Sequence, residues 1–510
     1  MIESLLARGG DLVETADVCV IGSGGGGAVA AAELAEAGLR VVVLEQGHHW
    51  TSRDFTQRED EMMPRLFEEA GMRQTVDGSV TLLQGRCVGG STVHNLCYAF
   101  RTPPEILRLW RDEHGLSSLT EAALEPSFAR VERNLKVKPI EEREVNALNA
   151  ALRRGAERLG WSGFVTRHNR EGCVQAGYCI LGCSYGAKQS MLVTYVPRAD
   201  AAGARVYANA RAERIEAEGG RVRRVLGHAV DDAGEISGSI EVSARVVVLA
   251  AGAIGSPDLL LRSQLGGEHV GRHLHLHPSV MAAGFWDEPL HAYRGIPQSY
   301  YIDEFIDLAR DPHAGTILMP ISGFPVLTAV SLPGFGRRHF AHMRGFAAMG
   351  GLLALLHDQS EGTVESGPSL SRPRIRYALT EPDRAQLSTG LRHCAEGLFA
   401  AGARRVVLPH VADPLVLEPG DDLAAIERIP VREGAVPLAS THPQSTCRMG
   451  QSAADSVVNA FGECHQVPGL FVADMSVFPT SLGAPPQITT AALADRTAHH
   501  VLSRWRELGG

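Results

Sequence analysis

The chain has 510 residues, of which 44% are hydrophobic and 21% charged, a composition typical of a globular protein with more than one domain. Its 49 basic and 58 acidic residues give a net charge of −9, which disfavours a nucleic acid or an anionic membrane as partner. No apolar run reaches the roughly 20 residues of a membrane span, and the N-terminus lacks the pattern of a signal peptide. We therefore expect a cytoplasmic protein with no membrane span. Its nine scattered cysteines predict reduced thiols.

The first elements predict a strand, a helix and a second strand. Residues 16–22 (ADVCVIG) form a short apolar run that ends in Gly, which is typical of a buried parallel strand. Residues 27–38 are rich in Ala and close on a Gly, as a helix does, and residues 39–45 (LRVVVLE) form a second apolar run. A strand, helix and strand in this short space predict a right-handed parallel crossover.

The loop between the first strand and the helix predicts a dinucleotide site. Gly22, Ser23, Gly24 and Gly27 belong to a GxGxxG pattern, in which glycines let backbone N–H groups approach a pyrophosphate at a helix N-terminus. Glu45 follows Gly27 by 18 residues, at the end of the second strand, where a carboxylate can bind ribose hydroxyls and would repel a 2′-phosphate. This pattern disfavours NADP and leaves NAD and FAD open.

The rest of the chain predicts a cofactor domain made of separated segments. Residues 103–190 are more polar and irregular, and strand-like pieces follow at 205–207 and 245–249. Residues 278–432 mix strand-like and helix-like segments. The α/β character returns near the C-terminus, with a strand-like GLFVAD and a helix over 489–505. We expect a substrate domain inserted in pieces into the cofactor domain.

Five further motifs occur in order along the chain. They are GRCVGGSTVHNLCYAF (85–100), AAGAIGSPDLLLRS (250–263), THPQSTCRMG (441–450), LFVADMSVFP (470–479) and TTAALADR (489–496). Together with the glycine loop, this set resembles the glucose–methanol–choline (GMC) family of flavoprotein oxidoreductases. The resemblance implies FAD and an α/β fold. A Rossmann-like FAD-binding domain is expected over residues 1–102, 193–277 and 433–510, with an inserted α+β substrate domain on an antiparallel sheet over 103–192 and 278–432.

The resemblance also implies roles for individual residues. Those expected to hold the ADP half of FAD lie in the glycine loop and at the end of the second strand: Gly22, Ser23, Gly24, Gly27 and Glu45. Those expected to line the flavin are Gly89, Gly90, Ser91 and Asn95. The backbone of Ala212 would meet the adenine, Asp474 the ribityl chain or pyrophosphate, and Gln487 the isoalloxazine. The N-terminus of the last helix would point at the flavin pyrimidine and stabilise negative charge there.

His94 stands directly before Asn95, at a spacing where some family members attach the flavin covalently. Two states are open: a bond between His94 and the flavin 8α-methyl, or a ring that lies against the flavin without a bond.

The resemblance implies oxidation of an alcohol. His442 in Thr441-His442-Pro443 matches the catalytic His of the family and is expected to act as general base, with hydride passing to the flavin N5. Dioxygen or a quinone or protein carrier would accept the electrons. The second catalytic position of the family, usually His or Asn, is Pro485 here, and proline has no side-chain donor or acceptor. Pro485 therefore motivates one alternative hypothesis, a flavin-containing lyase or other non-redox enzyme. A binding or assembly protein that keeps FAD structurally is a second alternative.

Two clusters invite a metal interpretation. Cys173, Cys179 and Cys183 lack the spacing of zinc or ferredoxin sites, so we interpret them as loop structure. His273, His275 and His277 alternate, which predicts that they share one face of a strand. We predict no metal at either place.

Overall fold

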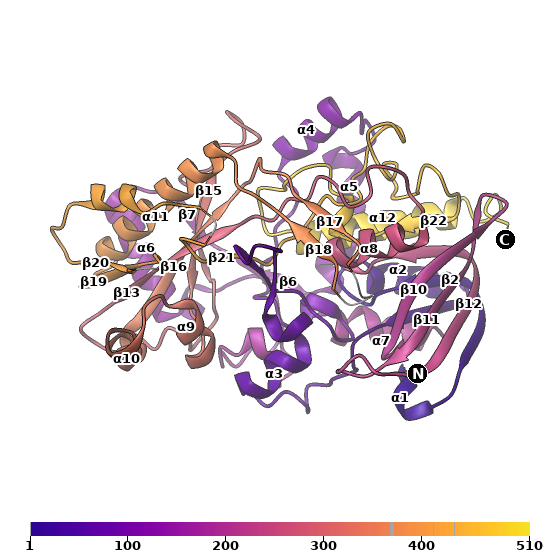
Figure 1. Ribbon diagram of the computed structural model, residues 1–510, viewed down its shortest axis with the longest axis horizontal. Helices are drawn as coiled ribbons and strands as arrows, with labels where there is room; N and C mark the ends of the chain where they lie inside the picture. The colour runs from indigo at the N-terminus through magenta and orange to yellow at the C-terminus, as the bar shows by residue number, and fades with distance from the viewer. Residues whose placement is uncertain (1, 368–371, 412, 433, 510) are drawn as a thin grey trace.

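The computed structural model describes residues 2–367, 372–411, 413–432 and 434–509. The predicted domain boundary at residue 433 lies outside the described residues. The fold consists of two large β-sheets, one on each side of Figure 1, with helices packed around them. Among the helices of the described ranges, none has both the length and the apolar character needed to cross a membrane.

The sheet on the right of Figure 1 carries the predicted strand–helix–strand unit. Six of its strands pair in parallel, and two continue it as an antiparallel hairpin. In spatial order, the described strands are β1 (Ile2–Ser4), β9 (Arg205–Ala208), β3 (Val41–Glu45), β2 (Leu12–Ile21), β12 (Ile236–Leu249), β11 (Arg221–Val230) and β10 (Ala210–Glu218), with β22 (Leu470–Val472) beside the end of β12. The predicted strands and their parallel pairing are therefore confirmed, although β2 begins four residues before the predicted start.

The second sheet is mostly antiparallel, with one parallel pair between β5 and β21. Its described strands follow the order β4 (Arg73–Gln74), β5 (Val80–Leu82), β21 (Leu438–Ser440), β13 (Ser279–Phe285), β16 (Met349–Leu356), β15 (Thr316–Ile321), β14 (Tyr300–Ile302) and β7 (Gly163–Val165), with β19 (Arg405–Leu408) and β20 (Leu415–Leu417) beside β13. Two small pairs complete the strands: β17 (Thr363–Glu365) with β18 (Arg374–Arg376), and β6 (Val137–Pro139) with β8 (Arg167–Asn169).

The helices cover both sheets. Within the described ranges they are α1 (Leu5–Arg8), α2 (Gly27–Glu36), α3 (Glu59–Leu66), α4 (Pro104–His114), α5 (Glu121–Asn134), α6 (Ala147–Leu159), α7 (Tyr195–Ala201), α8 (Gly252–Ser263), α9 (Pro325–Ser331), α10 (Gly336–Arg344), α11 (Glu381–Ala400) and α12 (Gln487–Ser503). The small side chains of α2 are buried, so the helix lies close to β2, α7 and α12. In Figure 1, α6 and α11 lie against the second sheet, where α11 packs on β13 and β16.

Alternation along β15 and β16 separates two groups of side chains. Leu318, Leu352 and Ala354 pack into the core below α11, whereas Met319 and Leu353 belong to a separate apolar cluster. This is the two-residue period of a strand with both faces in use. The observed architecture confirms the predicted α/β fold, with a Rossmann-like unit and a second, largely antiparallel sheet.

Candidate active site and cofactor cavity

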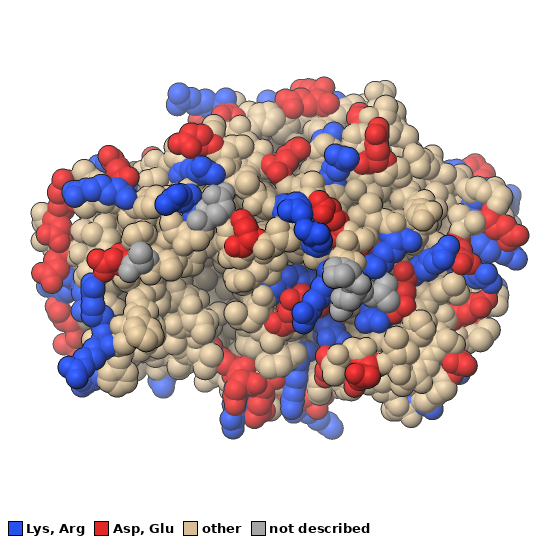
Figure 2. Space-filling view, in the orientation of Figure 1, with Lys and Arg blue, Asp and Glu red and all other residues tan. Residues whose placement is uncertain are grey.

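A cavity of about 590 Å³ lies between the two sheets. The glycine loop, the end of β3 and the start of α12 form one part of its wall, and strands of the second sheet form another. On the face drawn in Figure 2, the surface is hollowed near its centre, and acidic and basic side chains are interspersed around it. The cavity size falls in the range of pockets that hold organic ligands.

The glycines of the first loop divide into two kinds. A Cβ on Gly24 or Gly25 would have its nearest neighbour at 3.8 Å, an ordinary contact, and both glycines line the cavity. A Cβ on Gly26 would stand 1.6 Å from the carbonyl oxygen of Ala473, and one on Gly27 would stand 2.0 Å from that of Gly22. Packing therefore demands Gly26 and Gly27, while Gly24 and Gly25 leave the backbone exposed to a ligand at the N-terminus of α2.

Glu45 is buried at the end of β3, and its carboxylate faces the same loop. One oxygen accepts hydrogen bonds from the Ser23 backbone N–H (2.9 Å) and hydroxyl (2.7 Å), and the other accepts one from the Gly47 N–H (2.9 Å). Burial raises the pKa of Glu45, and the hydrogen bonds from Gly47 and Ser23 oppose that shift. Three of the roughly four acceptor sites of the carboxylate are used, so the oxygen that faces Gly47 can still accept a hydrogen bond from a ribose hydroxyl.

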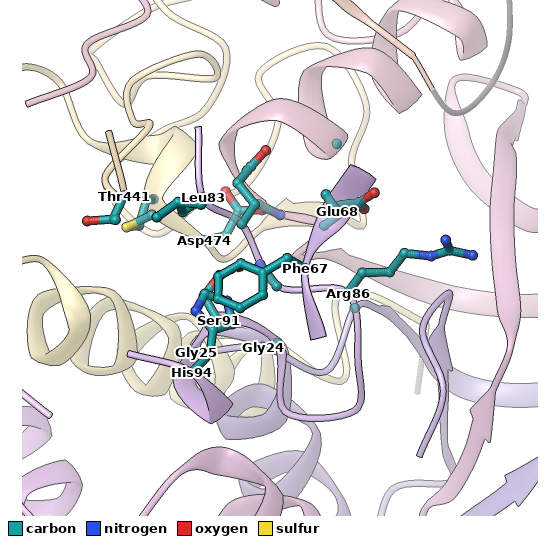
Figure 3. Close-up of a pocket in the computed structure, with 18 of the residues that line it drawn as sticks. Gly24, Gly25, Phe67, Glu68, Leu83, Arg86, Ser91, His94, Thr441 and Asp474 are labelled. Carbon is teal, nitrogen blue, oxygen red and sulfur yellow. Dashed lines mark hydrogen bonds between the residues drawn. The ribbon is translucent and has the colours of Figure 1, made fainter. Parts of the chain in front are cut away.

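The second glycine loop meets the first across the cavity. Gly90 has φ +55°, and a Cβ there would lie 2.8 Å from the Cα of Gly24. Figure 3 shows Ser91 and His94 beside Gly24 and Gly25, with the ring of Phe67 near them. The centroids of the His94 and Phe67 rings are 3.9 Å apart. The positive φ and the close approach of the two loops therefore explain the glycine at position 90.

His94 is buried, and its Nε2 has no hydrogen-bond partner in the described part of the chain. Burial, together with the nearby charge of Lys188, lowers the pKa of His94 to about 3. The Lys188 ammonium fixes the loop from behind, because it donates to the carbonyl oxygens of Val93 (2.8 Å), Asn95 (2.6 Å) and Cys179 (2.6 Å). A neutral imidazole is thus held at the cavity wall by a rigid backbone.

The start of α12 closes one end of the cavity. Pro485, Pro486 and Gln487 line it, and the amide of Asn95 donates to the side-chain oxygen of Gln487. The Gln487 amide donates in turn to Asn169 (3.1 Å). The helix begins at Gln487, two residues before the predicted start, and Gln487 and Thr490 of its first turn line the cavity.

Asp474 follows β22 and is buried. Its carboxylate accepts hydrogen bonds from the Gly252 N–H (2.9 Å), the Ser256 hydroxyl (2.5 Å) and the Ser476 N–H (2.8 Å). Burial raises the pKa of Asp474, while the hydrogen bonds from Ser256 and Ser476 oppose the shift. Asp474 therefore joins the start of α8 to the loop after β22 and places one carboxylate at the cavity wall.

His442 lies two residues after β21, on the side of the cavity that the second sheet forms. Burial lowers the pKa of His442 to about 4, so the ring is neutral at neutral pH. The described side chains that β13, β15, β16 and β21 contribute to the cavity carry no charge: Ser279, Met319, Ile321, Leu353, Leu355 and Ala439. His442 thus stands at the edge of a largely apolar chamber.

Most of the predicted cofactor and catalytic residues line this one cavity. They are Gly22, Gly24, Glu45, Gly90, Ser91, His94, Asn95, Ala212, His442, Asp474 and Gln487. Ser23, Gly27 and Gly89 do not line it. Ser23 holds Glu45 and accepts a hydrogen bond from the Gly89 N–H (3.0 Å), so these residues support the wall from behind.

Comparison with known proteins identifies the family. Residues 63–279 and 358–494 match the N-terminal and C-terminal patterns of GMC oxidoreductases, and residues 17–53 match an FAD-binding domain. A GMC-type oxidoreductase from Mycobacterium tuberculosis is 32% identical over 98% of this chain and 78% of its own length. The chain belongs to the GMC oxidoreductase family.

Other members of the GMC family extend the comparison. A long-chain-alcohol oxidase from Arabidopsis thaliana is 30% identical over 94% of this chain and 67% of its own length. The crystal structure of pyridoxine 4-oxidase from Mesorbium loti has a TM-score of 0.73 at 21% identity and covers 96% of this chain and 99% of its own. This last likeness shows that the two chains share a fold.

FAD is the cofactor of this GMC oxidoreductase, and the cavity fits it. Gly24 and Gly25, the Glu45 and Asp474 carboxylates, and His94, whose Nε2 has no hydrogen-bond partner among the described residues, all line one cavity. These groups suit a pyrophosphate, hydroxyl groups and a ring system, respectively.

Sequence reasoning missed several residues of the site. Phe67 lies between the motifs, and only its contact with His94 reveals it. Lys188 belongs to GAKQS, but its hydrogen bonds to three carbonyls cannot be deduced from that string. Arg86 and Glu68 also line the cavity.

The histidines of HLHLHP correct one expectation. His273 and His277 have φ of +60° and +48°, and the segment is not a regular strand, so the predicted shared strand face is wrong. His273 contacts Glu361, whereas His277 contacts His442. Within the described residues, the single cluster with metal-like spacing is Glu33, Asp495 and His499, away from this segment. The nine cysteines are free thiols, as the sequence predicts.

Proposed function

We propose that this GMC oxidoreductase oxidises an apolar alcohol at His442. When FAD is bound, its flavin supplies the hydride acceptor. The chain supplies a neutral imidazole at the end of the cavity that faces the second sheet, and an aliphatic wall beside it. The observation that carries the proposal is that His442 lines the same cavity as Met319, Ile321, Leu353 and Leu355.

The substrate class follows from that wall. Aliphatic side chains offer no hydrogen bonds to the hydroxyl groups of a sugar and no charge to a cation such as choline, so desolvating those substrates would be costly. Two relatives bear names that agree with an alcohol substrate: long-chain-alcohol oxidase and 2-methyl-1,2-propanediol dehydrogenase.

The test is anaerobic reduction of the bound flavin. We expect 1-octanol and benzyl alcohol to bleach the visible flavin band, and glucose and choline to leave it unchanged at equal concentration. Bleaching by glucose or choline but not by 1-octanol would refute the substrate class. The general-base role of His442 stays a sequence-based prediction, and loss of flavin reduction in His442→Ala tests whether the residue takes part at all.

We also propose that His94 bonds covalently to the flavin. The support is its buried, neutral ring at the cavity wall, with an Nε2 that no described group satisfies. Denaturation in acid distinguishes the two states. A covalently bound flavin precipitates with the unchanged protein, and in His94→Ala the flavin is instead released into the supernatant. Release of the flavin by the unchanged protein contradicts the bond.

A flavin-containing lyase is the second candidate, because Pro485 lies at the cavity wall where the family usually has His or Asn. A lyase would turn over substrate without bleaching the flavin under anaerobic conditions. For an oxidoreductase, the acceptor is decided by reoxidation: peroxide formed in air favours dioxygen, and faster reoxidation by a quinone favours a carrier.

A further inference from the structure

A second histidine stands directly behind His442. The Nδ1 atoms of His277 and His442 are 3.3 Å apart, and the two rings are perpendicular, with an interplanar angle of 89°. His277 is fully buried and does not line the cavity. It therefore touches His442 but does not reach the space where a substrate would bind.

The other nitrogen of His277 has a partner that can only donate. The backbone N–H of Gly483 donates to His277 Nε2 over 3.1 Å. A backbone amide cannot exchange roles with its acceptor, so His277 Nε2 must be without a proton.

Each of the two rings carries one proton. Burial lowers the pKa of His277 well below its ordinary value and lowers that of His442 to about 4, so both are neutral at neutral pH. The single proton of His277 then sits on Nδ1 and is donated to His442 Nδ1. Consequently, the single proton of His442 sits on Nε2, which forms no hydrogen bond within the described residues.

We propose that His277 is a positioning residue that holds His442 with its proton on Nε2, so that His442 meets the substrate oxygen as a hydrogen-bond donor. The proton position follows from the hydrogen bonds of this chain alone. The role toward substrate rests on the proposed function. It differs from the general-base role that the sequence predicts, because a nitrogen that already bears a proton cannot accept another.

The surroundings of His277 hold this arrangement in place. The Asp358 carboxylate accepts hydrogen bonds from the backbone N–H of His277 (3.1 Å) and from the hydroxyl of Ser481 (2.7 Å). Asp358 thus joins the His277 segment to the loop that carries Gly483. The same loop continues to Pro485, which lacks a donor. A donor on His442 would compensate for the one that Pro485 cannot provide.

The protons and electrons of the reaction balance without a proton on or off His442. With FAD bound, the flavin would supply the acceptor for the hydride of the carbinol C–H bond. The O–H proton would leave to solvent, which is the proton acceptor that this proposal requires. The carbonyl double bond forms while the Nε2–H of His442 stays hydrogen-bonded to the oxygen, where it stabilises the negative charge that develops.

Replacing His442 by Gln or Ala distinguishes a role as hydrogen-bond donor from a role as general base. A Gln amide can donate a hydrogen bond from near the Nε2 position, but it cannot accept a proton, and Ala can do neither. With 1-octanol and holoenzyme under anaerobic conditions, we expect His442→Gln to reduce the flavin within about tenfold of the unchanged protein, and His442→Ala to be about 100-fold slower or worse. Equal losses in both variants overturn the donor role.

The proton position is read directly by nitrogen NMR of holoenzyme labelled with ¹⁵N-histidine, using His442→Gln to identify the signals of His442. We expect a pyrrole-like Nε2 and a pyridine-like Nδ1. This pattern should be lost in His277→Phe and kept in His342→Phe, a control at a buried histidine of α10 whose ring packs on Phe285. A proton on Nδ1 of the unchanged protein overturns the proposal. If no alcohol reduces the flavin, the proposed function fails, while the spectrum still decides the proton position.

Discussion

Adjacent glycines of the first loop should respond in opposite ways to the same added methyl group. In Gly26→Ala, the new Cβ would stand 1.6 Å from the Ala473 carbonyl oxygen, so the end of β22 or the loop must move by about 2 Å to reach ordinary contact. Both sides of this contact are backbone, and neither can turn away. We expect a loss of about 3 kcal/mol in the free energy of unfolding, at the upper end of overpacking.

In Gly25→Ala, the new Cβ meets only two threonine methyl groups at 3.8 Å, so the fold without cofactor should be as stable as before within about 1 kcal/mol. The methyl group instead occupies cavity space at the N-terminus of α2. We expect FAD affinity to fall about 100-fold, equivalent to about 2.7 kcal/mol.

The assay combines thermal unfolding of the apoprotein with FAD titration of both variants. A Gly25→Ala protein that binds FAD as tightly as the unchanged protein would refute the assignment of this loop to the cofactor. A Gly26→Ala protein with unchanged unfolding would refute the packing argument.

Three further predictions concern buried charges. In Glu45→Gln, an amide N–H₂ replaces one carboxylate oxygen that accepts a buried hydrogen bond. We expect the fold to be retained and FAD titration to show an affinity lowered by about 10- to 100-fold. An unchanged affinity would contradict the role of Glu45 at the ribose. Burial raises the pKa of Asp358, but contact with His275 and backbone donors outweigh it, so that the pKa lies well below its ordinary 3.8. The ionised carboxylate therefore stabilises the fold above about pH 4, and this stabilisation is lost as the pH falls further. Denaturant unfolding of Asp358→Asn should show about 3 kcal/mol less stability than the unchanged protein at pH 7, and a smaller decrease in stability below pH 4. Parallel stability curves of the two proteins against pH would argue against this role of Asp358. In Lys188→Met, three carbonyls lose their donor, and chemical denaturation should show a loss of about 3 kcal/mol that Lys188→Arg partly restores.

The cofactor half of the site could be predicted from the sequence because its signals are local. Gly22 to Gly27 and Glu45 belong to one strand–helix–strand unit, whose apolar runs and glycines determine both the elements and the loop between them. The structure places Gly24 and Glu45 in one cavity, as that unit requires.

The catalytic half could not be predicted in the same way because its contacts join distant segments. His277 and His442 are 165 residues apart, and their contact depends on how β21 and β13 pair in the second sheet. The alternating histidines suggested a strand, but positive φ at His273 and His277 turns the side chains in different directions. Phe67 reaches His94 in the same way, through tertiary packing that no local pattern encodes.

The alternation along β15 and β16 has a consequence for how this enzyme can diversify. Met319, Ile321, Leu353 and Leu355 line the cavity, while Leu318, Leu352 and Ala354 fill the core below α11. Selection, or a designed library, can therefore change these four positions to fit a different alcohol without altering the core below α11. The glycine loops lie on other segments and would be inherited unchanged, so substrate preference can evolve separately from the cofactor.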